Sequence, residues 1–144
     1  VNWAEWQFAK TDDDPFSEHQ PDTIDCSPAA MQMEGEQLEI QTDFCNYAFL
    51  KWEANQPVDT DTTLAFLMLH SGLWAPEAAL AHAALLHEKN ILWEEQFPIP
   101  SSGDFFYSEI TLERPISQGD LIRLHLHNHG PNDWKLGYLK PLNP

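Results

Sequence analysis

The chain has 144 residues and a formal net charge of −16, from 23 Asp and Glu against 7 Lys and Arg. Such a surface repels phosphate backbones and anionic lipids, because binding to either relies on Lys and Arg. We therefore expect that the protein neither binds nucleic acid nor inserts into a membrane. With 42% apolar residues and six Trp, the composition is that of a folded protein, and we expect one domain over residues 1–144.

The first thirty-five residues are predicted to be an irregular segment packed on the domain. The acidic run at 12–14 is followed by a proline, and Pro21 and Pro28 flank Cys26. Proline-rich, charged stretches of this kind break regular structure. We therefore expect residues 1–35 to be a loop-like segment tethered by its cysteine.

The two cysteines, Cys26 and Cys45, do not have the spacing of a zinc site. We expect one disulfide between them, which stabilises the fold by about 3 kcal/mol through loop closure. A disulfide implies an oxidising compartment, and the chain opens at Val1 without an apolar leader. The expectation is a secreted, periplasmic or cell-surface protein whose signal peptide has been removed; two free cytosolic thiols are the alternative.

Alternation of apolar and polar residues dominates the rest of the chain and predicts strands. The predicted strands cover residues 36–44, 47–53, 62–69, 91–97, 105–112, 121–128 and 134–139. In residues 77–86, Ala and Leu favour a helix, but the polar stretch 87–90 between apolar pairs is typical of a hairpin loop, so we predict a strand there. This spacing predicts an all-β fold: an antiparallel, jelly-roll-like β-sandwich.

The strand predicted at 121–128 carries an unusual group of histidines. In an extended chain, His125, His127 and His129 lie on the face opposite Ile122, with successive side chains about 7 Å apart. Two such imidazoles can converge on one metal ion, and neutral imidazole suits copper or zinc. The hypothesis favoured by the sequence is therefore a transition-metal-binding protein. The predicted ligands are His125 and His127, helped by His129, His70 or His82.

The competing interpretation of these histidines is hydrogen bonding within a polar sheet face or its turn. Enzyme motifs are incomplete: Gly119 with His125 and His127 resembles the start of the cupin metal motif, but the later Glu and the second motif are missing. Neither H-E-x-x-H nor G-x-S-x-G occurs, and nothing distinguishes an acid pair such as Glu94 and Glu109. We expect a protein without catalytic activity.

The aromatic residues support a second hypothesis, a carbohydrate-binding or cell-surface adhesion module for a neutral glycan. Exposed rings stack on sugars while neighbouring polar groups bind hydroxyls. The candidate residues are Trp74, Trp134, Tyr138, Phe105 and Phe106, although Trp134 interrupts an apolar alternation as core residues do. A structural subunit of an extracellular assembly is the third alternative.

Two motifs, D-F-C-N-Y at 43–47 and H-L-H-N-H-G-P-N-D-W at 125–134, resemble those of secreted or lipid-anchored proteins of myxobacteria and related bacteria whose activity is not established. The resemblance runs from about Cys26 to the end of the chain, and the histidine motif is its more specific part. It implies an exported bacterial β-sandwich. It assigns no activity.

Overall fold

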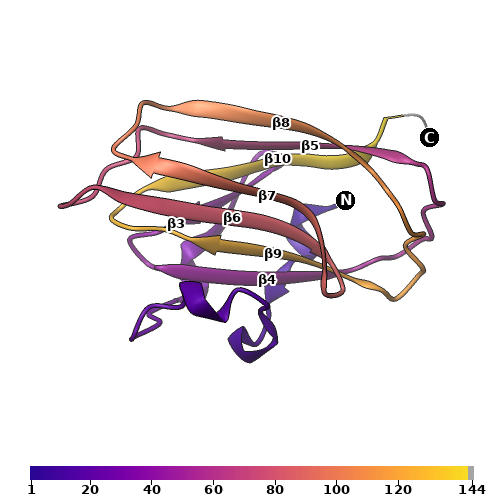
Figure 1. Ribbon diagram of the computed structural model, residues 1–144, viewed down its shortest axis with the longest axis horizontal. Coiled ribbons are helices and arrows are strands. Elements are labelled where there is room, and N and C mark those ends of the chain that lie inside the picture. The colour runs from indigo at the N-terminus through magenta and orange to yellow at the C-terminus, as the bar shows by residue number, and fades with distance from the viewer. Residues whose placement is uncertain (143–144) are drawn as a thin grey trace.

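The computed structural model describes residues 1–142 and consists of two five-stranded antiparallel sheets packed face to face (Figure 1). The strands are β1 (Gln7–Phe8), β2 (Met31–Glu34), β3 (Gln37–Gln41), β4 (Tyr47–Glu53), β5 (Thr63–His70), β6 (Ala79–His87), β7 (Asn90–Ile99), β8 (Asp104–Thr111), β9 (Leu121–His127) and β10 (Asp133–Pro141). The predicted all-β sandwich is confirmed.

The first sheet has the strand order β1-β4-β9-β6-β7 and the second sheet has the order β2-β3-β10-β5-β8. Apart from the hairpins β2–β3 and β6–β7, hydrogen-bonded neighbours are strands far apart in the sequence. Strands β4-β9-β6-β7 of the first sheet and strands β3-β10-β5-β8 of the second form the arrangement of a jelly roll. Because the chain crosses repeatedly between the sheets, residues from both halves of the sequence meet on each face.

Strand β6 occupies the stretch in which helix propensity and hairpin signals conflict. Ala81, Ala83 and Leu85 are buried in the core between the sheets, while Ala84 and Leu86 are buried in a second apolar cluster with Phe16. Alternate residues therefore pack in different clusters, as an extended chain requires. Strand β7 continues through Pro98, past the predicted end at Phe97. This is tolerated because β7 is an edge strand, where a missing amide proton costs no bond to a further strand.

The core is formed by alternate residues of facing strands. Strand β9 contributes Ile122, Leu124 and Leu126, and Trp134 of β10 is fully buried among them. Trp3, near the start of the chain, is also buried, and its indole N–H donates to the carbonyl of Gly137 at 3.0 Å. The aromatic N-terminal end is thus part of the core.

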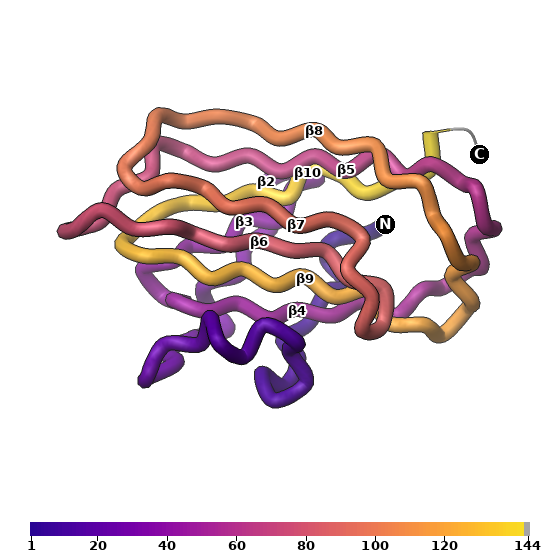
Figure 2. Tube along the Cα trace, in the orientation of Figure 1, coloured from indigo at the N-terminus to yellow at the C-terminus, as the bar shows by residue number. Residues whose placement is uncertain are grey.

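Residues 1–35 contain four single-turn 3-10 helices besides β1 and β2: η1 (Trp3–Glu5), η2 (Thr11–Asp13), η3 (Ser17–His19) and η4 (Pro28–Ala30). Residues 9–24, named here the covering segment, cross the outer face of the first sheet next to β4 (Figure 2). Phe16 is buried there against Tyr47 and Leu86. The Cys26–Cys45 disulfide ties the end of this segment to the start of β4, as predicted.

The H-L-H-N-H-G-P-N-D-W motif forms the end of β9, the turn after it and the start of β10. Asn128 is buried and donates to Thr42 Oγ1 at 2.9 Å, while its carbonyl oxygen accepts from the indole N–H of Trp134 at 3.1 Å. The side-chain amide of Asn132 makes two hydrogen bonds with the backbone of Trp74: its oxygen accepts from the Trp74 N–H at 2.7 Å, and its nitrogen donates to the Trp74 carbonyl at 3.1 Å. Much of this motif therefore fixes a turn.

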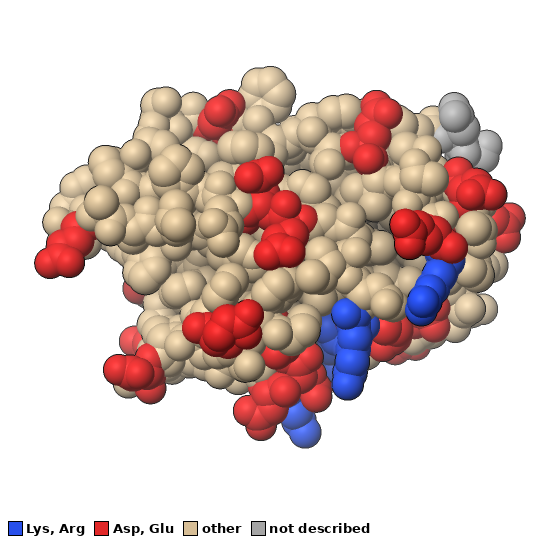
Figure 3. All heavy atoms as spheres, viewed as in Figure 1, with Lys and Arg blue, Asp and Glu red and all other residues tan. Residues whose placement is uncertain are grey.

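Acidic side chains are scattered over the face seen in Figure 3 and do not gather in one patch, while the Lys and Arg of this view lie in its lower right part. Within residues 1–142, no helix is long and apolar enough to cross a membrane.

Candidate functional site

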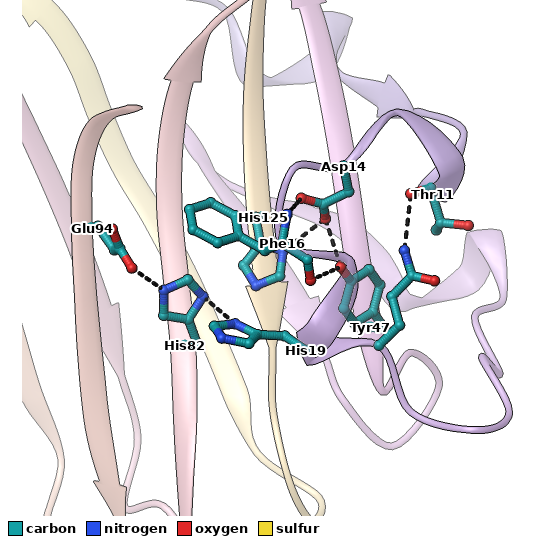
Figure 4. Close-up of polar contacts among 9 residues, drawn as sticks. Thr11, Asp14, Phe16, His19, Tyr47, His82, Glu94 and His125 are labelled. Carbon is teal, nitrogen blue, oxygen red and sulfur yellow. Dashed lines mark hydrogen bonds and ion pairs between the residues drawn. The ribbon is translucent and has the colours of Figure 1, made fainter. Parts of the chain in front are cut away.

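Three imidazole rings meet beneath the covering segment: His82 from β6, His125 from β9 and His19 from η3 (Figure 4). One ring nitrogen of each lies within 4.8 Å of the others, and Nδ1 of His19 is 2.9 Å from Nδ1 of His82. We call this group the histidine cluster. The extended β9 strand predicted from the sequence supplies His125, whereas His19 was not among the predicted residues.

Each strand histidine has a carboxylate on its other ring nitrogen. His82 Nε2 lies 2.8 Å from Glu94 Oε1 on β7, and His125 Nδ1 lies 2.7 Å from Asp14 Oδ2 on the covering segment. The same Asp14 oxygen accepts from the hydroxyl of Tyr47 at 2.7 Å. A carboxylate facing one nitrogen directs the lone pair of the other nitrogen into the cluster.

His125 and the Asp14 side chain are fully buried. Among the residues that the structure describes, Nε2 of His125 is a buried nitrogen without a hydrogen-bond partner. Leaving such a group unsatisfied costs about 1–3 kcal/mol. Because Nδ1 is held by Asp14, Nε2 is the nitrogen directed toward His19 and His82 (Figure 4).

Burial shapes the charge states around the cluster. It raises the pKa of Asp14, but hydrogen bonds from His125 and Tyr47 outweigh this effect and hold the Asp14 pKa below its usual value. Burial lowers the pKa of His82, partly offset by the hydrogen bond to Glu94. Burial, with the nearby His129 and His125, lowers the pKa of His127 to about 4. The folded protein therefore favours the ionised carboxylate of Asp14 and the neutral imidazoles of His82 and His127.

These shifts predict loss of stability in acid. An unfolded histidine takes up a proton near pH 6.5, whereas folded His127 resists protonation until about pH 4. Stability should therefore fall between these values, and because His127 is only partly buried and screened by solvent, its share of the loss is about 1–2 kcal/mol. The lowered Asp14 pKa adds a further loss below about pH 4, where the unfolded carboxyl is protonated first.

Urea denaturation at a series of pH values measures this loss. A His127→Gln variant should lack its part of the decline between pH 6.5 and 4, and a His129→Gln variant should show a smaller reduction of the decline, because His129 only contributes to the lowered His127 pKa. A free energy of unfolding that stays constant over this range would contradict the prediction.

The other predicted ligands lie in two places. His127 and His129, with ring centroids 4.6 Å apart, line a shallow hollow of about 360 Å³ that His19 and His82 also border. His70 lies in the second sheet, where its Nδ1 is 2.6 Å from the carbonyl of Ser71. Its ring packs against core aromatics, so the expectation that His70 could complete this ligand group is wrong.

The outer face of the second sheet carries exposed aromatic rings. Phe105 and Tyr107 of β8 are 64% and 47% exposed, and they pair across strands with Leu69 and Leu67 of β5. Tyr138 of β10 pairs with Leu67 from the other side. We name these residues the aromatic face: Phe105, Tyr107, Tyr138, Leu67 and Leu69.

Polar groups border the aromatic face. The hydroxyl of Tyr107 donates to Glu109 Oε1 at 2.8 Å, and Nζ of Lys140 lies 4.6 Å from the centre of the Tyr138 ring. These groups offer hydrogen bonds next to an apolar surface. Tyr107 was not in the predicted site, although the alternation along residues 105–109 places it beside Phe105.

Two predicted carbohydrate contacts, Phe106 and Trp134, do not lie on the aromatic face. Phe106 points inward, with its ring centre 4.5 Å from that of Phe97, because its neighbours on β8 point outward. Trp134 is 0% exposed, as its place in an apolar alternation indicated. Trp74 is 55% exposed on the loop after β5 and does not belong to β8, β5 or β10.

No family model matches the chain, and no curated protein matches it. Among solved structures, it is similar to a CBM4 carbohydrate-binding module, with a TM-score of 0.52 and 7% identity over 94% of this chain and 86% of that chain. A family 61 module in complex with beta-1,4-galactotriose matches with a TM-score of 0.44, at 10% identity over 95% of this chain and 98% of that one. A family 16 carbohydrate-binding module matches with a TM-score of 0.44, at 9% identity over 83% and 85%. The first similarity is one of fold: the chain is a jelly-roll β-sandwich.

Proposed function

We propose that this protein is an exported, noncatalytic binding protein that holds a neutral glycan on the aromatic face. The observation that carries the proposal is the pair of exposed rings, Phe105 and Tyr107, on one face of β8 with Tyr138 on the same face of the sheet. Exposed apolar surface bordered by polar groups marks a binding site, because large rings gain free energy when a ligand covers them.

The sheet also gives these rings a fixed spacing. Successive residues on one face of a strand lie about 7 Å apart, and hydrogen bonds to β5 hold β8 in place. Such a row of rings suits an extended ligand whose apolar faces repeat along its length. Glu109 and Lys140 supply hydrogen-bonding groups for hydroxyls at the edge of the row.

Three further observations support the proposal. The jelly-roll fold is shared with a carbohydrate-binding module, which is an argument by analogy and raises the expectation of a sugar ligand. The net charge of −16 disfavours polyanions and leaves neutral sugars. The Cys26–Cys45 disulfide fits an oxidising compartment outside the cytoplasm, as expected of an exported protein.

Glycan binding should be lost when the rings are removed. We expect Tyr107→Ala and Phe105→Ala each to weaken binding to a neutral oligosaccharide about tenfold or more, because central aromatic contacts typically contribute above 1 kcal/mol. Both side chains are exposed, so the fold should be preserved. A glycan array identifies the ligand, and calorimetric titration compares the variants.

Trp74→Ala is the matched control, since Trp74 is an exposed ring that lies off the aromatic face. It should bind like the unaltered protein. If no neutral glycan binds, or if Trp74→Ala loses as much affinity as Tyr107→Ala, the proposal fails. A dimer in solution that Tyr107→Glu separates would instead favour the third alternative, a subunit of an extracellular assembly.

A further inference from the structure

The histidine cluster lies on the sheet opposite the aromatic face and plays no part in the proposed glycan binding. We propose that His19, His82 and His125 bind one divalent transition-metal ion, with zinc and copper as the candidate ions. This inference is independent of the glycan proposal.

The ring nitrogens of the three histidines lie close to the positions that metal ligands occupy. In a tetrahedral zinc site with bonds of about 2.0–2.1 Å, the ligand nitrogens lie roughly 3.3 Å apart. Nδ1 of His19 and Nδ1 of His82 are 2.9 Å apart, and a nitrogen from each of the three rings lies within 4.8 Å of the others. A small inward adjustment of His125 would place all three around one ion.

The buried ring nitrogen of His125 also favours a metal ligand role. Its Nε2 is fully buried, has no hydrogen-bond partner within residues 1–142 and points into the cluster. Such nitrogens are rare in folded proteins unless a ligand satisfies them. A metal ion between the three rings would accept this lone pair.

Two carboxylates contact the ring nitrogens of His82 and His125 that point away from the cluster. Histidines that bind metals usually donate their other N–H to a carboxylate, which fixes the tautomer and strengthens the ligand nitrogen. Glu94 does this for His82, and Asp14 does it for His125. Three neutral imidazoles are a ligand set that zinc and copper accept. His19 and His82 also line the shallow hollow that His127 and His129 border.

The three proposed ligands come from two separate parts of the fold, so a bound ion would link these parts. His82 and His125 belong to the first sheet, whereas His19 belongs to the covering segment, so an ion would join the segment to the sheet. Binding to the folded state alone stabilises that state by mass action. We therefore expect zinc to protect the covering segment from proteolysis and hydrogen exchange.

Calorimetric titration of the metal-free full chain with zinc tests the site, with copper titrated separately. We expect one ion per chain. His19→Ala should weaken zinc binding at least 100-fold, while Glu94→Gln should weaken it about 10- to 100-fold by releasing the His82 ring. His129→Ala is the matched control and should keep its affinity within about twofold, because His129 lies beside the hollow and outside the three ligands.

His19 is the preferred position for the test because it is only partly buried, whereas loss of the fully buried His125 endangers folding. A second readout is the visible absorption of the cobalt-substituted protein, whose tetrahedral spectrum should be absent in His19→Ala. No saturable binding of either metal, or equal affinities for His19→Ala and His129→Ala, overturns the proposal. Tyr107→Ala should leave zinc affinity unchanged, so failure of one proposal is distinguishable from failure of the other.

Discussion

Replacing Asp14 by Ala should destabilise the fold by about 3–5 kcal/mol. Its buried carboxylate receives hydrogen bonds from the Tyr47 hydroxyl and from the backbone N–H of Phe16, and one of its oxygens contacts Nδ1 of His125. Removing one partner of a buried polar group leaves the others desolvated and unpaired, and this costs more than the bonds alone. Urea denaturation at pH 7.5 measures the loss.

Two variants separate this effect from simple loss of charge. Asp14→Asn keeps the shape and an acceptor for Tyr47 or Phe16, so it should lose less than Asp14→Ala. Asp13→Ala removes the neighbouring carboxylate, which is exposed, and should change stability by no more than about 0.5 kcal/mol. An Asp14→Ala protein as stable as Asp13→Ala would show that this buried network does not hold the covering segment.

Replacing Gly130 by Ala should cost about 3 kcal/mol or more. Gly130 has a φ of +81°, a left-handed conformation that costs an L side chain about 1–2 kcal/mol. A Cβ atom there would also overlap the carbonyl oxygen of Trp74, whose peptide groups are held by Asn132. The turn must move to relieve the overlap, and the hydrogen bonds of Asn132 are lost with it.

Gly35→Ala is the matched control for this prediction. Gly35 also has a positive φ, +63°, but an added Cβ would meet no atom of the described residues within 4 Å. It should therefore lose only the conformational part, about 1–2 kcal/mol. Equal losses for the two variants, measured by thermal and urea denaturation, would mean that the contact with Trp74 does not restrict this turn.

Most of the fold could be predicted from the sequence because burial on one face produces a period of two. The alternation along residues 121–128 and 105–112 gave strands close to their observed limits. The stretch at 77–86 was harder because Ala and Leu favour a helix locally, and only burial against a partner sheet decides the outcome. Residues 31–34 were assigned to the irregular segment, since a short exposed strand lacks a clear apolar face.

The histidine cluster could be predicted only in part. His125 lies in an obvious motif and His82 was included, but His19 has no pattern around it that marks a ligand. It reaches the cluster because the covering segment folds back over the first sheet, a contact between distant parts of the chain. Asp14 was likewise assigned only to an acidic run in the irregular segment. In the structure its neighbour Asp13 is exposed, whereas Asp14 is 4% exposed.

In the structure, the motif that resembles those of bacterial exported proteins mainly stabilises a turn. Asn128, Gly130 and Asn132 stabilise a turn, and of its three histidines only His125 enters the cluster. His125 and His127 lie on β9 as predicted, whereas the expectation that His129 shares the strand face is wrong, because β9 ends at His127. The ring of His125 meets His19 and His82 from other elements. The relation to that bacterial group, and with it the site of export, stays a prediction.

The covering segment also constrains the order in which the molecule assembles. Asp14 meets His125 across 111 positions of the sequence, and Trp3 meets Gly137 across 134. Loops of this length close slowly, and folds rich in them belong to the millisecond-to-second class. The first twenty residues also pack on β4 and β6, but the contact of Asp14 with His125 cannot form until β9 has been synthesised, so complete docking of the covering segment should follow the formation of β9.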